Sequence, residues 1–235
     1  MSRFYFFYIL TFLLLITISN GSADTIETVF HNFKVAYEKS KNFSANFEET
    51  TLRAGNKSTA RGRLIFSKPN LLRKEYVSQR DPTQLAQLIV LDGEYSWSYT
   101  PLLSQVNKMK WGRSNRKELL PGLGASLDEA AEKFNMELVP DEVANPKGIY
   151  RIKLVPKPQI PPNLEANTPR EIIEIWVKSD KWLPVQFGYQ TENDNEGSIS
   201  VIVAFANIQR DIEMDADSFK FVIPDGVEVI DLSKE

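Results

Sequence analysis

Few side chains in this sequence are of the types that perform catalysis or bind metals. Its 235 residues include no cysteine and one histidine, His31, which lies among polar positions of an expected helix. We interpret His31 as a surface or half-buried helix residue, because a lone histidine without a local partner rarely marks a catalytic site. A zinc cluster has no ligands to draw on, and the G-x-S-x-G, H-E-x-x-H and phosphate-binding glycine-loop motifs are absent. We therefore expect no metal site, no cofactor and no catalytic residue.

Paired carboxylates are the remaining candidates for catalysis. Glu48 and Glu49 are of the type that glycosidases use in pairs. Neighbouring residues of a β-strand point to opposite faces of the sheet, so these two cannot flank the same bond. We interpret them as solvated residues at the rim of a sheet, and we expect a protein that is not an enzyme.

The N-terminal residues predict export. Arg3 precedes the apolar run 4–18, and the small residues Gly21 and Ala23 follow it. This order is that of a secretory signal, so we expect residues 1–23 to be cleaved and the protein to be exported. The alternative is an uncleaved anchor, but a bilayer span needs about 20 apolar residues and this run is shorter. Without cysteine there is no acceptor for N-terminal lipidation.

The mature chain is mildly acidic. Without Arg3, 27 basic residues face 31 acidic ones, which gives a formal charge of −4. This balance argues against a nucleic-acid partner. We find no internal repeat and no linker, so residues 24–235 are expected to form one domain.

Hydrophobic periodicity predicts one helix followed by many strands. Asp24 and Glu27 fit a capping box, and the apolar positions from Ile26 to Tyr37 recur at helical spacing. From Phe43 onward the apolar residues alternate, and turn signals such as Asp92-Gly93 separate short runs. The pattern indicates one antiparallel β domain of roughly nine to eleven strands.

Two segments interrupt the strand pattern. Residues 112–134 hold two short helical stretches, the second with Leu127, Ala130, Ala131 and Phe134 on one stripe. Residues 156–169 hold five of the thirteen prolines, which predicts an extended exposed loop. A helical pair within a β pattern suggests that it covers something.

The order of several short motifs resembles the LolA family of outer-membrane lipoprotein carriers. These motifs are N-F-S-A-N-F at 42–47, G-R-L-I-F at 62–66, K-P-N at 68–70, L-D-G-E-Y-S-W-S-Y-T-P at 91–101, W-L-P at 182–184 and F-K-F-V-I-P-D-G-V-E-V at 219–229. The D-G-x-x-x-W-x-Y-x-P block and the F-x-F-x-x-P-x-G-V ending are the most specific of them. Each motif is weak alone, but their shared order covers the whole mature chain.

The resemblance implies a fold and a function. The fold is mainly β with some α: an incompletely closed antiparallel β-barrel, or half-barrel, covered by a lid of short α-helices above an apolar cavity. The function is that of a monomeric periplasmic chaperone, which accepts acylated lipoproteins from an inner-membrane ABC-type release complex. It delivers them to an outer-membrane receptor of the LolB type. That receptor is itself lipidated, so the missing cysteine favours the carrier.

The resemblance also suggests which residues form the lipid site. We expect a cavity lined by Phe47, Leu64, Phe66, Leu88, Val90, Trp97, Tyr99, Ile152, Leu154 and Ile175. The expected lid residues are Leu119, Leu120, Leu123, Leu127 and Phe134. Alternation does not say which face of a strand points inward, so Tyr95, Trp97 and Tyr99 can instead pack outward against a helix.

Lys68 departs from the family pattern. The family has an arginine before the Pro-Asn motif that tethers the lid, and this chain has Lys68 there. A lysine can bond lid carbonyls through a point charge, but it lacks the planar fork of arginine. The alternative interpretation is a solvated lysine at the end of a strand.

Three other functions stay open at this stage. One is a lipid-sensing regulator of envelope stress on the same fold, although such regulators usually carry a second domain. Another is an exported enzyme with an unrecognised site. The third is a structural or adhesive β protein, for which a missing cavity would be the sign.

Overall fold

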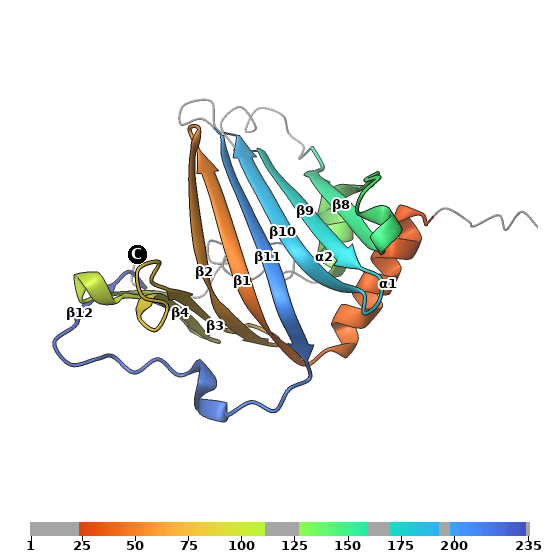
Figure 1. Ribbon diagram of the computed structural model, residues 1–235. Helices are drawn as coiled ribbons and strands as arrows, with labels where there is room; N and C mark the ends of the chain where they lie inside the picture. Colours follow the sequence, from red (N-terminus) through yellow and green to blue (C-terminus); the bar gives the residue numbers. More distant parts are fainter. Residues whose placement is uncertain (1–23, 111–126, 159–169, 193–197, 234–235) are drawn as a thin grey trace, which may run out of the picture.

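A single twelve-stranded sheet makes up most of the protein in the computed structural model (Figure 1). The structure describes residues 24–110, 127–158, 170–192 and 198–233. The strands are β1 (Asn42–Arg53), β2 (Asn56–Ser67), β3 (Leu71–Val77), β4 (Leu85–Asp92), β5 (Tyr95–Thr100), β6 (Gln105–Lys110), β7 (Phe134–Val139), β8 (Ile149–Pro156), β9 (Arg170–Lys178), β10 (Leu183–Glu192), β11 (Ile199–Arg210) and β12 (Glu228–Asp231). The described helices are α1 (Ile26–Lys39), α2 (Leu127–Lys133) and the 3-10 turns η1 (Pro101–Leu103), η3 (Asn145–Lys147) and η5 (Ala216–Phe219).

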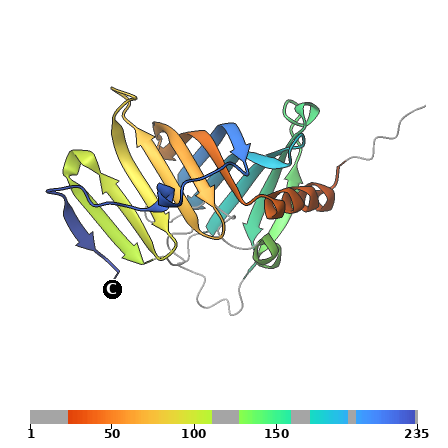
Figure 2. The ribbon, with the colours of Figure 1, turned by 90° about the horizontal axis from the view of Figure 1, so that it is seen from below.

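The sheet is open and strongly bent. Its order is β12-β6-β5-β4-β3-β2-β1-β11-β10-β9-β8-β7, so among the described strands β12 and β7 are the two unclosed edges. Two antiparallel meanders, β1 to β6 and β7 to β11, join where β11 pairs with β1. The bend gives the half-barrel of Figures 1 and 2. The predicted fold class is therefore confirmed, with two differences: the described residues form twelve strands, and β12 pairs with β6 in parallel.

The N-cap of helix α1 lies one residue later than predicted, at Thr25 instead of Asp24. The hydroxyl of Thr25 accepts a hydrogen bond from the backbone N–H of Thr28 at 3.3 Å, so Thr25 is the N-cap. Threonine and aspartate are both good N-cap residues, and here the carboxylate of Asp24 instead accepts a hydrogen bond from the Tyr150 hydroxyl. The helix ends at Ser40, whose N–H and hydroxyl donate to carbonyls of the last turn.

The second predicted helix is only partly correct. Leu127 and Ala130 are buried on α2. Phe134 was expected on the same helical stripe, but it opens β7 and pairs with Pro156. From this residue on, Phe134, Met136 and Leu138 alternate toward the core, and this period-two pattern decides in favour of a strand. Leu119, Leu120, Leu123, residues 159–169 of the proline-rich loop and residues 1–23 lie outside the described residues.

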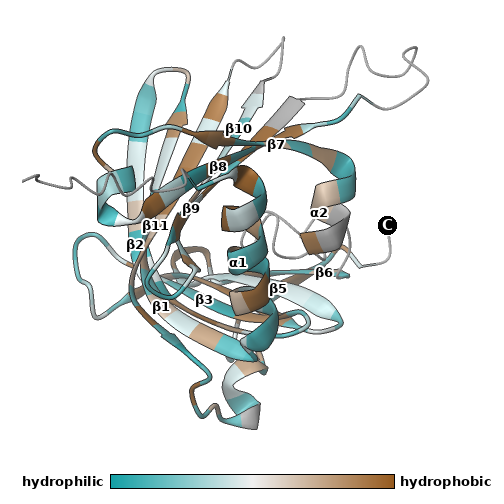
Figure 3. Ribbon diagram, turned by 90° about the vertical axis from the view of Figure 1, so that its right-hand side faces the viewer, coloured by the Kyte–Doolittle hydropathy of each residue, from teal (hydrophilic) through white to brown (hydrophobic). Residues whose placement is uncertain are grey.

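The strand register defines two faces of the sheet. Phe66 pairs with Phe43 on one side and Leu72 on the other, and Leu72 pairs with Leu91, so these four share a face. That face, called the inner face below, packs against buried residues of α1 and α2. Figures 2 and 3 show both helices on this side of the sheet. The opposite side is called the outer face.

Gly62 allows the close approach of three strands on the inner face. A Cβ atom at Gly62 would lie 1.8 Å from the carbonyl oxygen of Glu75 on β3 and 2.8 Å from the Phe47 ring on β1. The Phe47 ring in turn makes an edge contact with Tyr76, with centroids 5.0 Å apart. A side chain here would push β3 or the aromatic pair out of place.

The substitution Gly62→Ala should therefore destabilise the protein by roughly 3 kcal/mol, since backbone atoms block the added methyl group. Urea unfolding of the mature protein measures this difference. Gly188→Ala is the matched control, because its added Cβ would lie 3.3 Å from the edge of the Trp176 ring and 3.7 Å from the nearest backbone atom, the Val201 oxygen. Equal losses at the two positions would contradict the close approach at Gly62.

Candidate functional site

The inner face carries an apolar surface that extends across most of the sheet. Six of the ten predicted lining residues lie on it, each 3% exposed or less: Phe47, Leu64, Phe66, Ile152, Leu154 and Ile175. Register links them, because Ile152 pairs with Ile175 and Ile175 pairs with Phe187, another inward residue. The structure thus brings residues from both meanders together on one face. Sequence reasoning missed Phe187, Val201 and Val203, which continue the surface between them.

The other four predicted lining residues lie on the outer face, and that part of the prediction is wrong. Val90 pairs with Trp97 and Leu88 with Tyr99, whereas it is Leu91 that pairs with the inward residue Leu72. Leu88 to Leu91 are all buried, so β4 shows no alternation that would identify its inner face. Trp97 and Tyr99 therefore point outward, which was the alternative prediction. A helix was expected to cover them there, but another segment does so.

The cover of these outer residues is the C-terminal segment. The ring of Phe221 stacks on Trp97 with centroids 5.4 Å apart and contacts Tyr99 at 6.1 Å. Phe219, two residues earlier in the same segment, is also buried, 7% exposed. The indole N–H of Trp97 also donates to Asp92 Oδ2 at 2.7 Å. Burial opposes ionisation of Asp92, but this bond and the N–H groups of residues 94 and 95 outweigh it and lower the pKa of the carboxyl.

Helix α1 closes part of the inner face. Val29, Phe33 and Tyr37 form its buried stripe, and the helix contacts β7, β8 and β10 (Figure 3). An apolar pocket remains where Tyr37 faces Phe43, Leu183 and other inward residues, but its volume is only about 10 Å³. That is close to the smallest space that holds one water molecule. In this conformation α1 fills the region that it covers.

Lys68 joins the sheet to the end of α1. It follows β2, and its ammonium group donates to the carbonyl oxygens of Tyr37 at 2.5 Å and Glu38 at 3.2 Å. It also lies 4.3 Å from the centroid of the Tyr37 ring. Burial lowers the pKa of Lys68, while the charges of Glu38 and Asp211 oppose this shift. The last carbonyls of a helix have no intrahelical partner, and a cation there is favourable.

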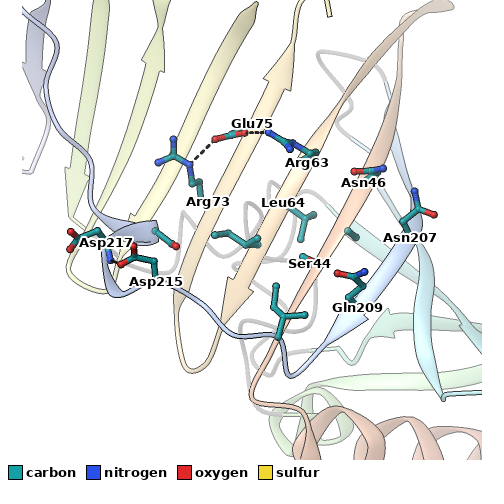
Figure 4. A pocket seen from close by; sticks show the side chains of 14 residues that line it. Ser44, Asn46, Arg63, Leu64, Arg73, Glu75, Asn207, Gln209, Asp215 and Asp217 are labelled. Atoms are coloured by element: carbon teal, nitrogen blue, oxygen red, sulfur yellow. Dashed lines mark hydrogen bonds and ion pairs between the residues drawn. The ribbon is translucent and has the colours of Figure 1, made fainter. Parts of the chain in front are cut away.

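A second hollow lies on the outer face and is polar. It measures about 730 Å³ and opens between the strands β1, β2, β3 and β11 and the segment that follows β11 (Figure 4). Its charged wall is Glu75, which accepts from Arg73 Nε at 2.7 Å and from Arg63 Nη2 at 3.4 Å. Asp215 and Asp217 lie across from them. Hydrocarbon gains little against such groups, since they would lose water without replacement. The inner face is therefore the candidate lipid site.

The described part of the chain has neither a cluster of metal ligands nor a helix suited to cross a membrane. No three His, Cys, Asp or Glu side chains there are placed to hold a metal ion. No helix in the described ranges has the length and apolar composition to cross a membrane.

Comparison with known proteins identifies the family. Residues 38–222 match the model of the outer membrane lipoprotein carrier protein LolA. The chain belongs to the LolA family. This confirms the resemblance seen in the motifs, and the match spans β1 to β11 together with Lys68, whereas most of α1 and all of β12 lie outside it.

Individual relatives of this LolA family member are distant. It is 34% identical over 116 residues to the outer-membrane lipoprotein carrier protein of Chromobacterium violaceum, covering 46% of this chain and 52% of that protein. It is 25% identical over 194 residues to an uncharacterised protein of Methanocaldococcus jannaschii, covering 83% and 50%. The chain thus spans about half the length of these curated relatives. A solved LolA superfamily protein from Nitrosomonas europaea shares 11% identity at a TM-score of 0.42, with 85% of this chain and 99% of that one covered.

The LolA sheet of this protein holds one charged group that the sequence interpretation missed. Glu49 was expected to be a solvated rim residue, but its side chain is 21% exposed and lies 2.7 Å from the ammonium of Lys74. Lys74 follows the inward Leu72 by two positions, and Glu49 follows Phe47 in the same way. That spacing was the available signal, because residues i and i+2 share a face.

Loss of the Lys68 contacts should loosen α1. In Lys68→Met the two carbonyl bonds are gone, so amide hydrogen exchange in residues 26–39 should accelerate about fivefold, as expected for a net loss near 1 kcal/mol. Lys68→Arg should retain most of the protection. Lys57→Met, which removes a charge from the exposed start of β2, is the control. Unchanged exchange in Lys68→Met would show that the link does not hold the helix.

Proposed function

We propose that this LolA family member carries acylated lipoproteins through the periplasm with their acyl chains against the inner face. The observation that supports this most is the apolar inner face itself, which extends from β7 to β4. A single amphipathic helix and α2 cover it in the described part of the chain. An open sheet can present such a surface to a ligand, while a closed small barrel fills itself with side chains.

The energetics suit a carrier that must also release its cargo. Each buried CH₂ group contributes about 0.8 kcal/mol, so one long acyl chain contributes roughly 10 kcal/mol. The pocket beneath α1 is nearly filled, so we propose that acyl chains displace this helix from the sheet. Exposure of Val29, Phe33 and Tyr37 then offsets part of the gain and keeps net affinity moderate. Lys68 acts in this proposal as the tether that returns the lid.

The route of the cargo is part of the proposal. The protein accepts lipoproteins from an inner-membrane ABC-type release complex and hands them to a LolB-like receptor of the outer membrane. Residues 1–23 act as the cleaved export signal, and residues 24–235 work as a monomeric single domain without enzymatic activity. Two observations support this route. The family is named for a lipoprotein carrier, and the sequence has no cysteine that could be lipidated.

Uptake of a lipoprotein by the purified mature protein tests this function. Leu64→Glu places a carboxylate on the inner face and should lower uptake from lipoprotein-loaded vesicles by at least about tenfold, because a buried charge is costly. Ile65→Glu, the next residue on β2 and on the outer face, should leave uptake unchanged. Bound lipoprotein is measured by co-purification and mass spectrometry.

Two further measurements separate loss of binding from loss of folding. Circular dichroism reports whether each variant is folded. A photo-cross-linking residue at Leu138, a half-buried inward position on β7, should label acyl chains in an otherwise unchanged protein. Equal uptake by both Glu variants, or no cross-link at Leu138, would overturn the inner-face site. Binding of lipid without transfer to outer-membrane acceptors would favour the regulator, and hydrolysis of the acyl esters would favour an enzyme.

A further inference from the structure

Three polar groups interrupt the apolar inner face. The Lys74 residue is only 8% exposed, and its ammonium lies 2.7 Å from Glu49 Oε2. The hydroxyl of Tyr76 donates to the same oxygen at 2.9 Å. The ammonium also lies 4.7 Å from the centroids of both the Phe47 and Tyr76 rings. A cation, an anion and a phenol thus form one compact cluster, called the inner polar cluster below.

The register places this cluster within the proposed acyl-binding surface. Lys74 pairs with Leu64 on β2 and with Ile89 on β4, both buried. It lies one inward position beyond Leu72, which is about 7 Å along the strand. Glu49 pairs with Val203, also inward. An acyl chain that lies against Leu64 and Leu72 is therefore within reach of the ammonium group.

Stability does not account for such a cluster. Removal of two charges from water costs several kcal/mol, and the attraction between them seldom offsets this cost. Apolar residues of similar volume therefore usually stabilise a fold at least equally. A surface that bound only hydrocarbon would gain from apolar residues here. An ammonium group has three N–H donors, and its contacts in this cluster are Glu49 and the faces of two rings. These donors are suited to an acceptor carried by the ligand.

We propose that Lys74, Glu49 and Tyr76 form a polar subsite for the ester or amide groups that join acyl chains to a lipoprotein. This inference rests on the proposed function. An ester carbonyl accepts an N–H from Lys74, and an amide can in addition donate its N–H to Glu49.

The charge balance of the cluster selects a neutral group. Glu49 balances the charge of Lys74, so a carbonyl adds a hydrogen bond without adding net charge. A fatty-acid carboxylate or a lipid phosphate would bring a second negative charge close to Glu49 in surroundings of low dielectric constant. The subsite therefore distinguishes an acylated molecule from a free fatty acid with the same hydrocarbon chain.

Two ligands of equal chain length test the subsite in the wild-type mature protein. One is a synthetic diacylated lipopeptide with two ester links, and the other is its diether analogue, which lacks the carbonyl oxygens. We expect the ester to bind about tenfold more tightly, as for hydrogen bonds to a charged donor. Titration calorimetry or displacement of a fluorescent lipid measures both affinities. This comparison uses no variant, so it decides the question even if a variant does not fold.

A paired substitution then locates the preference. Lys74→Met with Glu49→Leu removes both charges together and should reduce the ratio of the two affinities to about one, while binding of the diether stays at its wild-type value. Arg61→Met with Glu48→Leu is the matched control. That pair has the same 2.7 Å separation on the same strands β1 and β2, but its side chains are exposed, 71% and 48%. The control should keep the tenfold preference.

The outcomes separate this inference from the proposed function. If the wild-type protein binds neither lipopeptide, the carrier function itself fails. If it binds both with equal affinity, the carrier stands and the polar subsite is wrong. Tighter binding of palmitate than of the ester lipopeptide would also overturn the subsite, because it would show selection of an anion. Loss of preference in the control pair would place the effect outside the cluster.

Discussion

An open sheet with an apolar inner face needs a cover, and this requirement governs the rest of the structure. A closed barrel would bury the face permanently, but here β12 and β7 leave the sheet unclosed in the described ranges. The cover is a separate amphipathic helix, α1, held by its own apolar stripe and by the bonds that Lys68 makes to its last carbonyls. Because this cover is not part of the sheet, it can leave without disruption of any strand pairing.

The two faces are covered in different ways, and the difference matches their roles. On the outer face the C-terminal segment is fixed by stacked aromatic rings, Phe221 on Trp97 and Tyr99, and by the parallel pairing of β12 with β6. It is also fixed at its start, where Asn42 exchanges hydrogen bonds with the backbone of Ile212. A segment anchored at both ends is held on the outer face, whereas the lid that we propose to move, α1, lies on the inner face.

The sequence was sufficient for the class of fold but not for the faces of every strand. Alternation at Phe43 to Phe47 and at Leu64 to Phe66 marks one buried face, and the residues chosen there lie on the inner face. In β4 both faces are buried, so the period-two pattern is lost and Leu88 and Val90 were assigned to the wrong side. Phe134 fits a helix by its spacing to Leu127 and a strand by its alternation with Met136 and Leu138, and its pairing with Pro156 shows that it belongs to the strand. Contacts between residues far apart in the sequence decide which face of β4 points inward and whether Phe134 is helical. A local sequence pattern does not contain that information.

A surface that binds only by hydrophobic contact cannot distinguish an acylated lipoprotein from a free fatty acid, since both present the same methylene groups. Discrimination must come from polar groups placed where the chains end, and the position of Lys74 next to Leu64 and Leu72 meets that condition. A neutral ion pair also limits affinity, because its hydrogen bond to a carbonyl replaces contacts that Lys74 already has with Glu49 and two rings. The net gain is then smaller than that of a new bond to an unpartnered donor. In the proposed subsite, selectivity and release both depend on this arrangement.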